Sequence, residues 1–219
     1  MARYDGIADW YDTVFLSDFH EPSREAAMRL LGEAHGRLLD LACGTGAQTL
    51  AFSDAGWDVV GADASEDMLR RARDRGLETV CADATELPVE AASFDAVVSV
   101  WTHTDLDDFA AAVGEAARVL RPGGAFVYAG GHPCFVGPHS RFIGGEGVPE
   151  LHPGYLSEGR YGAEAPGVTS TGVRSKVGAS HLPLARFLHA FLDAGLTLER
   201  FEEAERREYP ATVALRWRR

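Results

Sequence analysis

The chain has 219 residues, of which 46% are hydrophobic and 25% are charged, and this suits one domain with a sizeable core. Its formal net charge of −12 argues against a nucleic-acid partner, because binding to a phosphate backbone depends on clustered Lys and Arg. No apolar run is long enough to cross a membrane and the N-terminus lacks a signal-peptide pattern, so we expect a cytoplasmic protein without a membrane partner.

The cysteines and histidines give no sign of a disulfide framework or a metal site. Cys43, Cys81 and Cys134 are too few and too scattered to staple a fold, so we expect reduced thiols. The eight histidines show no spacing typical of zinc binding. We therefore expect no metal.

Residues 1–36 begin with a stretch that is rich in aromatic and acidic side chains. We expect the part from Tyr4 to Phe19 to be a helical lid whose rings cover something apolar. The more ordinary alternative is a helix whose rings fill a groove. A second helix is predicted from Pro22, which suits a first helical turn, to Gly36. Residues 1–36 are thus predicted to be an N-terminal helical lid.

Strand and helix patterns then alternate as far as residue 129. Strands are predicted at 38–42, 57–62, 79–82, 94–101 and 125–129, and helices at 48–55, 65–75 and 109–120. Ser65 is a predicted N-cap, and Gly76 lies just past the end of the helix that Ser65 begins. Such alternation is typical of a doubly wound parallel sheet.

The pattern changes after Gly130. Residues 131–182 are rich in Gly and Pro and have no sustained period, so we predict an insertion that covers a substrate, with a short strand at 173–177. A helix at 183–194 and two strands at 196–201 and 211–217 follow, and the two strands are expected to pair as a hairpin. The prediction is one α/β domain over residues 1–219, a Rossmann-like doubly wound sheet with five parallel strands and a C-terminal antiparallel hairpin, seven strands in all.

The first predicted strand runs into a glycine turn, Cys43-Gly44-Thr45-Gly46, that leads to a helix. Such a corner lets backbone approach a ligand closely. Asp40, Asp63 and Asp83 each come at the carboxyl end of a predicted strand, where open α/β sheets bind their ligands. Three acids in one crevice suit a ligand with hydroxyl, amino and ammonium groups and would repel a diphosphate. The third glycine of the dinucleotide motif Gly-x-Gly-x-x-Gly is also absent.

On these residues the chain resembles the class I S-adenosylmethionine-dependent methyltransferases, in particular the small-molecule group of bacterial type. The motifs are Leu39-Asp40-Leu41-Ala42-Cys43-Gly44-Thr45-Gly46, Asp63-Ala64-Ser65-x-x-Met68-Leu69, Ala82-Asp83-Ala84, Phe94-Asp95-Ala96-Val97 and Leu120-Arg121-Pro122-Gly123-Gly124. The resemblance covers residues 4–128 well and the C-terminal hairpin loosely. It implies the same strand arrangement and the cofactor S-adenosylmethionine.

The resemblance also implies a role for each matching position. Asp40 would contact the amino group of the methionine part, directly or through water, and Asp63 would bind both ribose hydroxyls. Asp83 would accept a hydrogen bond from the adenine amino group, on which Met68 would pack, and Tyr11 would lie close to the sulfonium. Ala42 stands where the family has its first glycine. The full set implied to bind the cofactor is Tyr11, Asp40, Ala42, Cys43, Gly44, Gly46, Gln48, Asp63, Ala64, Met68, Asp83, Ala84, Val100 and Trp101.

Methyl transfer from a sulfonium needs a general base only when the acceptor must lose a proton. The candidates are His103 after the fourth strand, His132 after the fifth, and His181, whose segment His181-Leu182-Pro183-Leu184 resembles one that faces the acceptor in the family. Tyr11 joins them as a candidate catalytic residue. The ordinary alternative for each histidine is a hydrogen-bonded or surface position.

The leading hypothesis is a methyltransferase acting on a small aromatic or apolar acceptor, of the secondary-metabolite kind, by O-, N- or C-methylation. One alternative is a protein that binds S-adenosylmethionine without methyl transfer. Another is a nicotinamide-dependent reductase, although the chain has no Tyr-x-x-x-Lys pair and Lys176 is its single lysine. We expect a monomer or homodimer, and the sequence leaves the acceptor and the methylated atom open.

Overall fold

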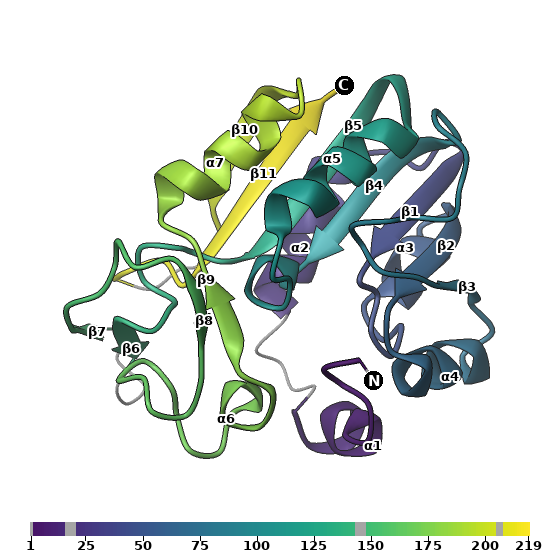
Figure 1. Cartoon of the computed structure of the whole chain (residues 1–219). Coiled ribbons are helices and arrows are strands. Elements are labelled where there is room, and N and C mark those ends of the chain that lie inside the picture. Colours follow the sequence, from purple (N-terminus) through teal and green to yellow (C-terminus); the bar gives the residue numbers. More distant parts are fainter. Residues whose placement is uncertain (1, 16–20, 143–147, 205–207) are drawn as a thin grey trace.

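A seven-stranded sheet runs through the molecule in the order β10-β11-β5-β4-β1-β2-β3 (Figure 1). The computed structural model describes residues 2–15, 21–142, 148–204 and 208–219. Pairing is parallel from β5 to β3 and antiparallel where β11 joins β5 and β10. The sheet consists of β1 (Arg37–Leu41), β2 (Asp58–Asp63), β3 (Glu78–Cys81), β4 (Phe94–Val100), β5 (Leu120–Gly131), β10 (Thr197–Glu203) and β11 (Thr212–Arg218). The predicted architecture, including the C-terminal antiparallel pair, is confirmed.

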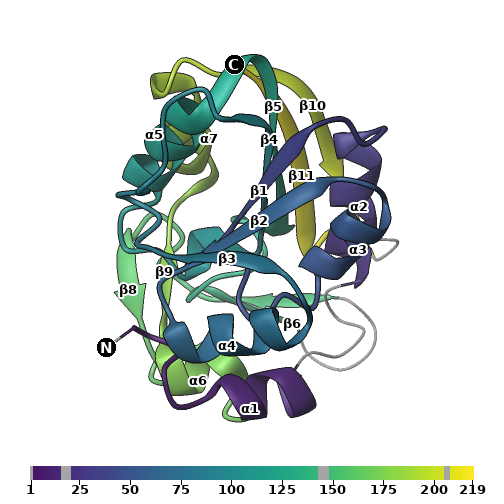
Figure 2. The same ribbon diagram turned by 90° about the vertical axis from the view of Figure 1, so that its right-hand side faces the viewer.

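Helices cover both faces of this sheet (Figures 1 and 2). The helices α2 (Glu21–Leu31) and α3 (Thr49–Asp54) cover one face, and α5 (Phe109–Val119) and α7 (Leu184–Asp193) cover the other, while α4 (Glu66–Asp74) packs on β2 and β3. Neighbouring residues of a strand point to opposite faces. In β5, Phe126 and Tyr128 therefore join the core under α5 and α7, whereas Val127 and Ala129 join the core under α2.

Short elements gather at the end of the sheet to which β4 points (Figure 1). They include α1 (Ala8–Trp10), the π-helical turn η1 (Tyr11–Phe15) and the 3-10 turn η3 (Thr102–Thr104). The single helix expected from Tyr4 to Phe19 is thus two short turns in the described part, and Phe19 and His20 lie outside the described residues.

The segment 131–182 contains more regular structure than its composition indicates. Strands β6 (Ser140–Phe142) and β7 (Pro149–Leu151) pair, as do β8 (Gly159–Tyr161) and β9 (Ala179–His181). The strand predicted at 173–177 is wrong, because Val173–Val177 form the helix α6. Val173 and Val177 are four residues apart, so one helical turn brings them to the same side, and Gly178 ends the turn with a positive φ of 70°.

Within the described residues, no helix is both long and apolar enough to cross a lipid bilayer.

The core under α5 and α7 depends on stacked aromatic rings. Phe191 is fully buried, and its ring stacks on Trp217 with the centroids 4.7 Å apart. We expect Phe191→Ala to lower the free energy of unfolding by about 3 to 5 kcal/mol, because it removes buried contacts and leaves a cavity. Leu192→Ala, at a neighbouring position that is 51% exposed, is expected to change it by less than about 0.5 kcal/mol. Denaturant unfolding of both variants tests this, and equal losses would contradict it.

Candidate functional site

A cavity of about 590 Å³ opens at the carboxyl ends of the parallel strands. β1 and β4 are neighbours in the sheet, and the chain continues from them in opposite directions, which is the arrangement where open α/β sheets bind ligands. The walls come from four strand ends, from the N-terminal segment and from β8, and include Tyr4, Tyr11, Ala42, Gly44, Asp63, Met68, Asp83, Val100, Trp101, Asp105 and Arg160.

The glycine turn after β1 lies close against α4. A side chain on Gly46 would place its Cβ 2.4 Å from Leu77 and 3.0 Å from Ala72, so this position has no room for one. Ala42 has a left-handed φ of 60°, a conformation that costs a residue with a Cβ about 1 to 2 kcal/mol. The alanine therefore keeps the backbone shape that a glycine would adopt more easily.

Asp63 connects the end of β2 to the two loops beside it. Its Oδ2 accepts a hydrogen bond from the Gly44 amide (2.9 Å) and its Oδ1 accepts one from the Ser65 amide (2.8 Å). Burial raises the pKa of this carboxyl, and the two amides oppose the rise. Ser65 in turn caps α4 by accepting from the Met68 amide (3.3 Å). One carboxylate thus fixes the glycine turn and the start of a helix on the cavity wall.

Asp40 and Asp83 lie in contrasting surroundings. Asp40 is 2% exposed, lies behind the cavity wall and accepts a hydrogen bond from Thr49 Oγ1 (2.6 Å). Burial raises its pKa to about 7. Asp83 lies on the wall and accepts from the amide (2.9 Å) and hydroxyl (2.7 Å) of Thr85, which hold its pKa below the usual value. The three predicted acids are therefore gathered at one edge, but with different access to the cavity.

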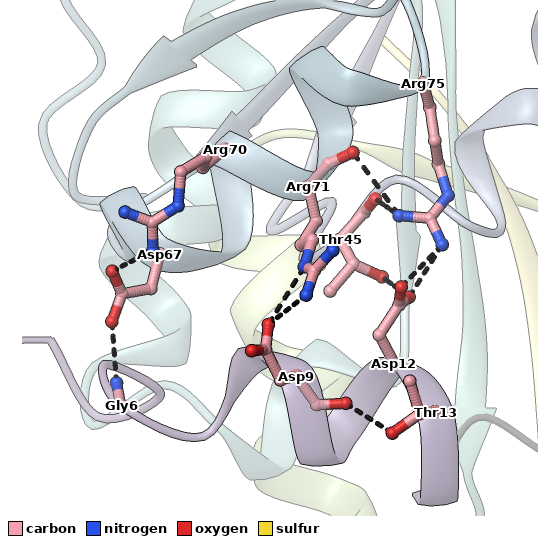
Figure 3. A network of polar contacts seen from close by, with 9 residues as sticks. All are labelled: Gly6, Asp9, Asp12, Thr13, Thr45, Asp67, Arg70, Arg71 and Arg75. Carbon is pink, nitrogen blue, oxygen red and sulfur yellow. Dashed lines mark hydrogen bonds and ion pairs between the residues drawn. The ribbon is translucent and has the colours of Figure 1, made fainter.

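The N-terminal segment is bonded to the glycine turn (Figure 3). Arg75 Nη2 donates to both oxygens of Asp12 (2.8 and 2.7 Å), and Thr45 Oγ1 donates to the same carboxylate (2.8 Å). Arg75 Nη1 also donates to the Thr45 carbonyl oxygen (2.9 Å). With side chains only 26% and 12% exposed, this ion pair is better protected from water than an ordinary surface pair.

Two further contacts tie the start of the segment to α4 (Figure 3). The Gly6 amide donates to Asp67 Oδ2 (2.7 Å), and Asp9 pairs with Arg71. Arg71 and Asp9 are 37% and 80% exposed, so the second contact is expected to add little stability.

The segment 131–182 reaches the cavity from the other side. Arg160 lies on the wall and pairs with Asp107 (3.7 Å), which also accepts from Ser180 Oγ (3.2 Å). Lys176 of α6 lies over the ring of Trp10, 4.6 Å from its centroid. The N-terminal segment and the segment 131–182 therefore both reach the wall and contact each other.

An aromatic and acidic group lies where the N-terminal segment meets η3. Tyr4 donates a hydrogen bond to Asp105 Oδ1 (2.8 Å), and the ring of Tyr4 packs edge-on against that of Tyr11 (5.6 Å between centroids). Burial raises the pKa of Asp105 to about 6. Sequence reasoning missed Asp105, because it belongs to no motif. The available signal was its place just beyond the end of the fourth strand.

Trp101 lies on the same wall in a left-handed conformation with a φ of 63°. Its Nε1 donates to Ser23 Oγ of α2 (2.8 Å). Such strained positions cluster at functional sites.

The three predicted histidines lie away from the cavity wall. His103 is fully buried between Phe109, Phe187 and Tyr128, and burial lowers its pKa to about 3, so the ring is neutral. His132 and His181 are 3% and 1% exposed, and burial lowers the pKa of each. Each ring is a buried base without access to this cavity.

The predicted cofactor residues divide into two groups. Those on the wall are Tyr11, Ala42, Gly44, Asp63, Ala64, Met68, Asp83, Ala84, Val100 and Trp101. Those behind it are Asp40, Cys43, Gly46 and Gln48. The second group supports the wall instead of forming it. Within the described residues, no cluster of three or more His, Cys, Asp or Glu could hold a metal.

Residues 39–128 match the methyltransferase domain family. The chain is similar to demethylmenaquinone methyltransferases, with 40% identity over 132 residues to that of Corynebacterium urealyticum and 38% over 135 residues to that of Clavibacter sepedonicus. These matches cover 58% of this chain and 57% and 55% of the relatives, so the chain matches little more than half of their length.

The chain is also similar, over nearly its whole length, to a solved structure. It is an S-adenosylmethionine-dependent methyltransferase from Mesorhizobium loti, with 26% identity and a TM-score of 0.72. The match covers 98% of this chain and 99% of that protein.

We expect Arg75→Ala to free the N-terminal segment, because it removes the bidentate pair with Asp12 and the bond to Thr45. Amide hydrogen exchange of residues 2–15 should become faster by about tenfold, equivalent to about 1.4 kcal/mol. Arg73→Ala, which removes an arginine that is 45% exposed and pairs with Glu66 within α4, is the matched control and should leave this exchange unchanged. Equal exchange in wild type and Arg75→Ala would contradict the expectation.

Asp40 is expected to make stability depend on pH. Its folded pKa of about 7 lies above its ordinary value of 3.8, so the folded state binds its proton more tightly than the unfolded state. The contribution of this proton to the stability of the folded state is complete below about pH 4 and is lost as the pH rises through 7. Thermal unfolding should show that Asp40→Asn loses less stability than wild type between pH 5 and 8. Parallel curves would contradict this.

Proposed function

Since the chain belongs to the class I S-adenosylmethionine-dependent methyltransferases, we propose that it transfers the methyl group of S-adenosylmethionine to a small aromatic or apolar acceptor. The observation that carries the proposal is Asp63, a carboxylate on the cavity wall whose two oxygens hold the glycine turn and the start of α4 in place.

The cavity suits the chemistry of this cofactor. Its carboxylates can accept hydrogen bonds from hydroxyl and amino groups, and they attract a positive charge. We assign the ribose hydroxyls to Asp63, the adenine to Asp83, Ala84 and Met68, and the methionine side to the glycine turn, Val100 and Trp101. Asp40 lies behind the glycine turn, so its carboxylate would attract the ammonium group across the residues that line the cavity. The cofactor supplies an already activated methyl group, so the protein has to orient the acceptor and exclude water.

We assign the cover over the cavity to residues 1–36 and 131–182 of the single domain 1–219. Tyr4 and Tyr11 from the first segment and Arg160 from the second lie on the wall. Contacts between Lys176 and Trp10 join the two covers. A closed cover of this kind would keep water from the transferring methyl group.

We place the acceptor beside Tyr4, Tyr11 and Trp101. Their rings form an apolar and aromatic part of the wall, which favours an aromatic or apolar acceptor. The relatives from Corynebacterium urealyticum and Clavibacter sepedonicus are named for demethylmenaquinone, so quinone-type compounds belong in the acceptor panel. The off-wall positions of His103, His132 and His181 give no reason to assign them the base.

Asp63→Ala tests the proposal. Calorimetry should show that wild type binds S-adenosylhomocysteine and that the variant binds it about 10- to 150-fold more weakly, because hydrogen bonds to a charged group contribute about 1.5 to 3 kcal/mol. Asp58→Ala, at the opposite end of β2 where the side chain is 65% exposed, should bind like wild type.

Methyl transfer is then measured with labelled S-adenosylmethionine and a panel of phenols, quinols, amines and carboxylic acids. Absence of S-adenosylhomocysteine binding would overturn the proposed cofactor. Binding without transfer to any acceptor would favour a non-methylating binding protein.

A further inference from the structure

Asp105 is a wall carboxylate that the assigned cofactor contacts do not use. It follows η3 and lines the cavity beside Tyr4 and Tyr11. Its Oδ1 accepts the hydrogen bond from Tyr4 (2.8 Å), whereas its Oδ2 accepts none from any residue that the structure describes. One oxygen is therefore held in place and the other is available to a ligand.

Among the residues that the structure describes, no cation forms an ion pair with Asp105. Arg3, which lies nearby, donates instead to the Thr104 carbonyl oxygen (3.4 Å) and to Asp107 (2.6 Å). Arg174 acts on Asp105 only through the longer-range charge interaction. A desolvated carboxylate without an ion pair is costly, and such groups in clefts are candidates for function.

The other wall carboxylates are engaged or more open to water. Both oxygens of Asp63 accept amide hydrogen bonds, and Asp83 accepts two from Thr85. Asp107 pairs with Arg3 and Arg160, and the exposed Asp108 caps α5 through the Ala111 amide (2.9 Å). Asp105 thus combines desolvation with an unoccupied oxygen in a way that these four do not.

We propose that Asp105 is the general base of the proposed methyl transfer and that the acceptor is a neutral hydroxyl or amine compound. The inference rests on the proposed function and names its base and its acceptor class. The acceptor oxygen or nitrogen forms a bond to the methyl carbon while the carbon–sulfur bond breaks and its electron pair goes to sulfur. The proton of the acceptor passes to Asp105 Oδ2, and from there to water after the products leave.

Charge around the site selects this acceptor class. Asp63, Asp83, Asp105 and Asp107 surround the cavity, against Arg3 and Arg160, which already pair with Asp107. A carboxylate or phosphate acceptor would be repelled, whereas a neutral hydroxyl or amine can donate its proton to Asp105 Oδ2. Tyr4 positions the carboxylate by holding the other oxygen.

The surroundings of Asp105 bring its pKa closer to neutral pH than that of an ordinary aspartate. Burial raises its pKa to about 6, and the Tyr4 hydrogen bond opposes the rise. A bound sulfonium would lower this raised pKa, so the carboxylate is ionised at neutral pH. The titratable and charged groups that act on Asp105 are Arg3, Tyr4, Tyr11, Asp63, Tyr128, Tyr161 and Arg174.

Asp105→Asn tests the proposal on the full chain, with phenols, quinols, amines and carboxylic acids as acceptors. We expect wild type to methylate hydroxyl or amine compounds, and the variant to lose at least about 100-fold in kcat, as for removal of a general base. Its affinity for S-adenosylhomocysteine should stay within about threefold of wild type, a difference of less than 1 kcal/mol. Asp193→Asn is the matched control, because Asp193 is an exposed carboxylate at the end of α7 and is not on the cavity wall, and it should keep wild-type kcat.

Tyr4→Phe provides a second variant whose effect is a shift in pH. Without the hydrogen bond from Tyr4, the pKa of Asp105 should rise, and the acidic fall of kcat should move to higher pH. Infrared spectra of the protein with S-adenosylhomocysteine give a readout without turnover. The carboxylate band that wild type has and Asp105→Asn lacks should disappear on acidification, and at higher pH in Tyr4→Phe.

Three outcomes would overturn the inference. They are unchanged kcat in Asp105→Asn, equal losses in Asp105→Asn and Asp193→Asn, and a wild type that binds S-adenosylhomocysteine but methylates only carboxylic acids or no hydroxyl or amine compound. Failure to bind S-adenosylhomocysteine would instead overturn the proposed function.

Discussion

The site depends on the two hydrogen bonds that Asp63 accepts from the amides of Gly44 and Ser65. A buried carboxylate is costly without such partners, and free amides beside it would be costly as well. Each group therefore stabilises the other. Because Gly44 follows β1, Asp63 ends β2 and Ser65 begins α4, this contact joins two strands and a helix around one cavity. Loss of Asp63 would leave the Gly44 and Ser65 amides without this acceptor.

Different kinds of contact stabilise the core around α7 and the segments beside the cavity. Around α7, rings such as Phe191 and Trp217 stack in a dry core. At the cavity, ion pairs and hydrogen bonds such as that of Asp12 with Arg75 connect the N-terminal segment to the end of α4 and to the glycine turn. Polar contacts that are partly open to water can break without loss of the core.

Most of the sheet could be predicted from the sequence, whereas the short elements of residues 2–15 and of the segment 131–182 could not. Long apolar runs such as 94–101 and 125–129 encode central strands, because both of their faces are buried. The three-residue strands between 140 and 181 are too short to show a period among Gly and Pro. Val173–Val177 is a single helical turn with opposing local signals. Its branched residues favour a strand, whereas the i,i+4 spacing of its two valines suits a helix. Contacts with the rest of the domain decide whether such short segments form a helix or a strand.

By itself the sequence determined the parallel sheet and the C-terminal antiparallel pair, because both follow from local hydrophobic periodicity. It also determined that Asp40, Asp63 and Asp83 lie at strand ends, where such sheets bind their ligands. Only the tertiary structure decided which of these side chains face the cavity. It put Asp40 behind the glycine turn beside Thr49, and His103 in the aromatic core. It also brought Asp105 to Tyr4, 101 residues away along the chain. Access to a cavity and a shifted pKa arise from contacts between distant segments, and no local pattern encodes them.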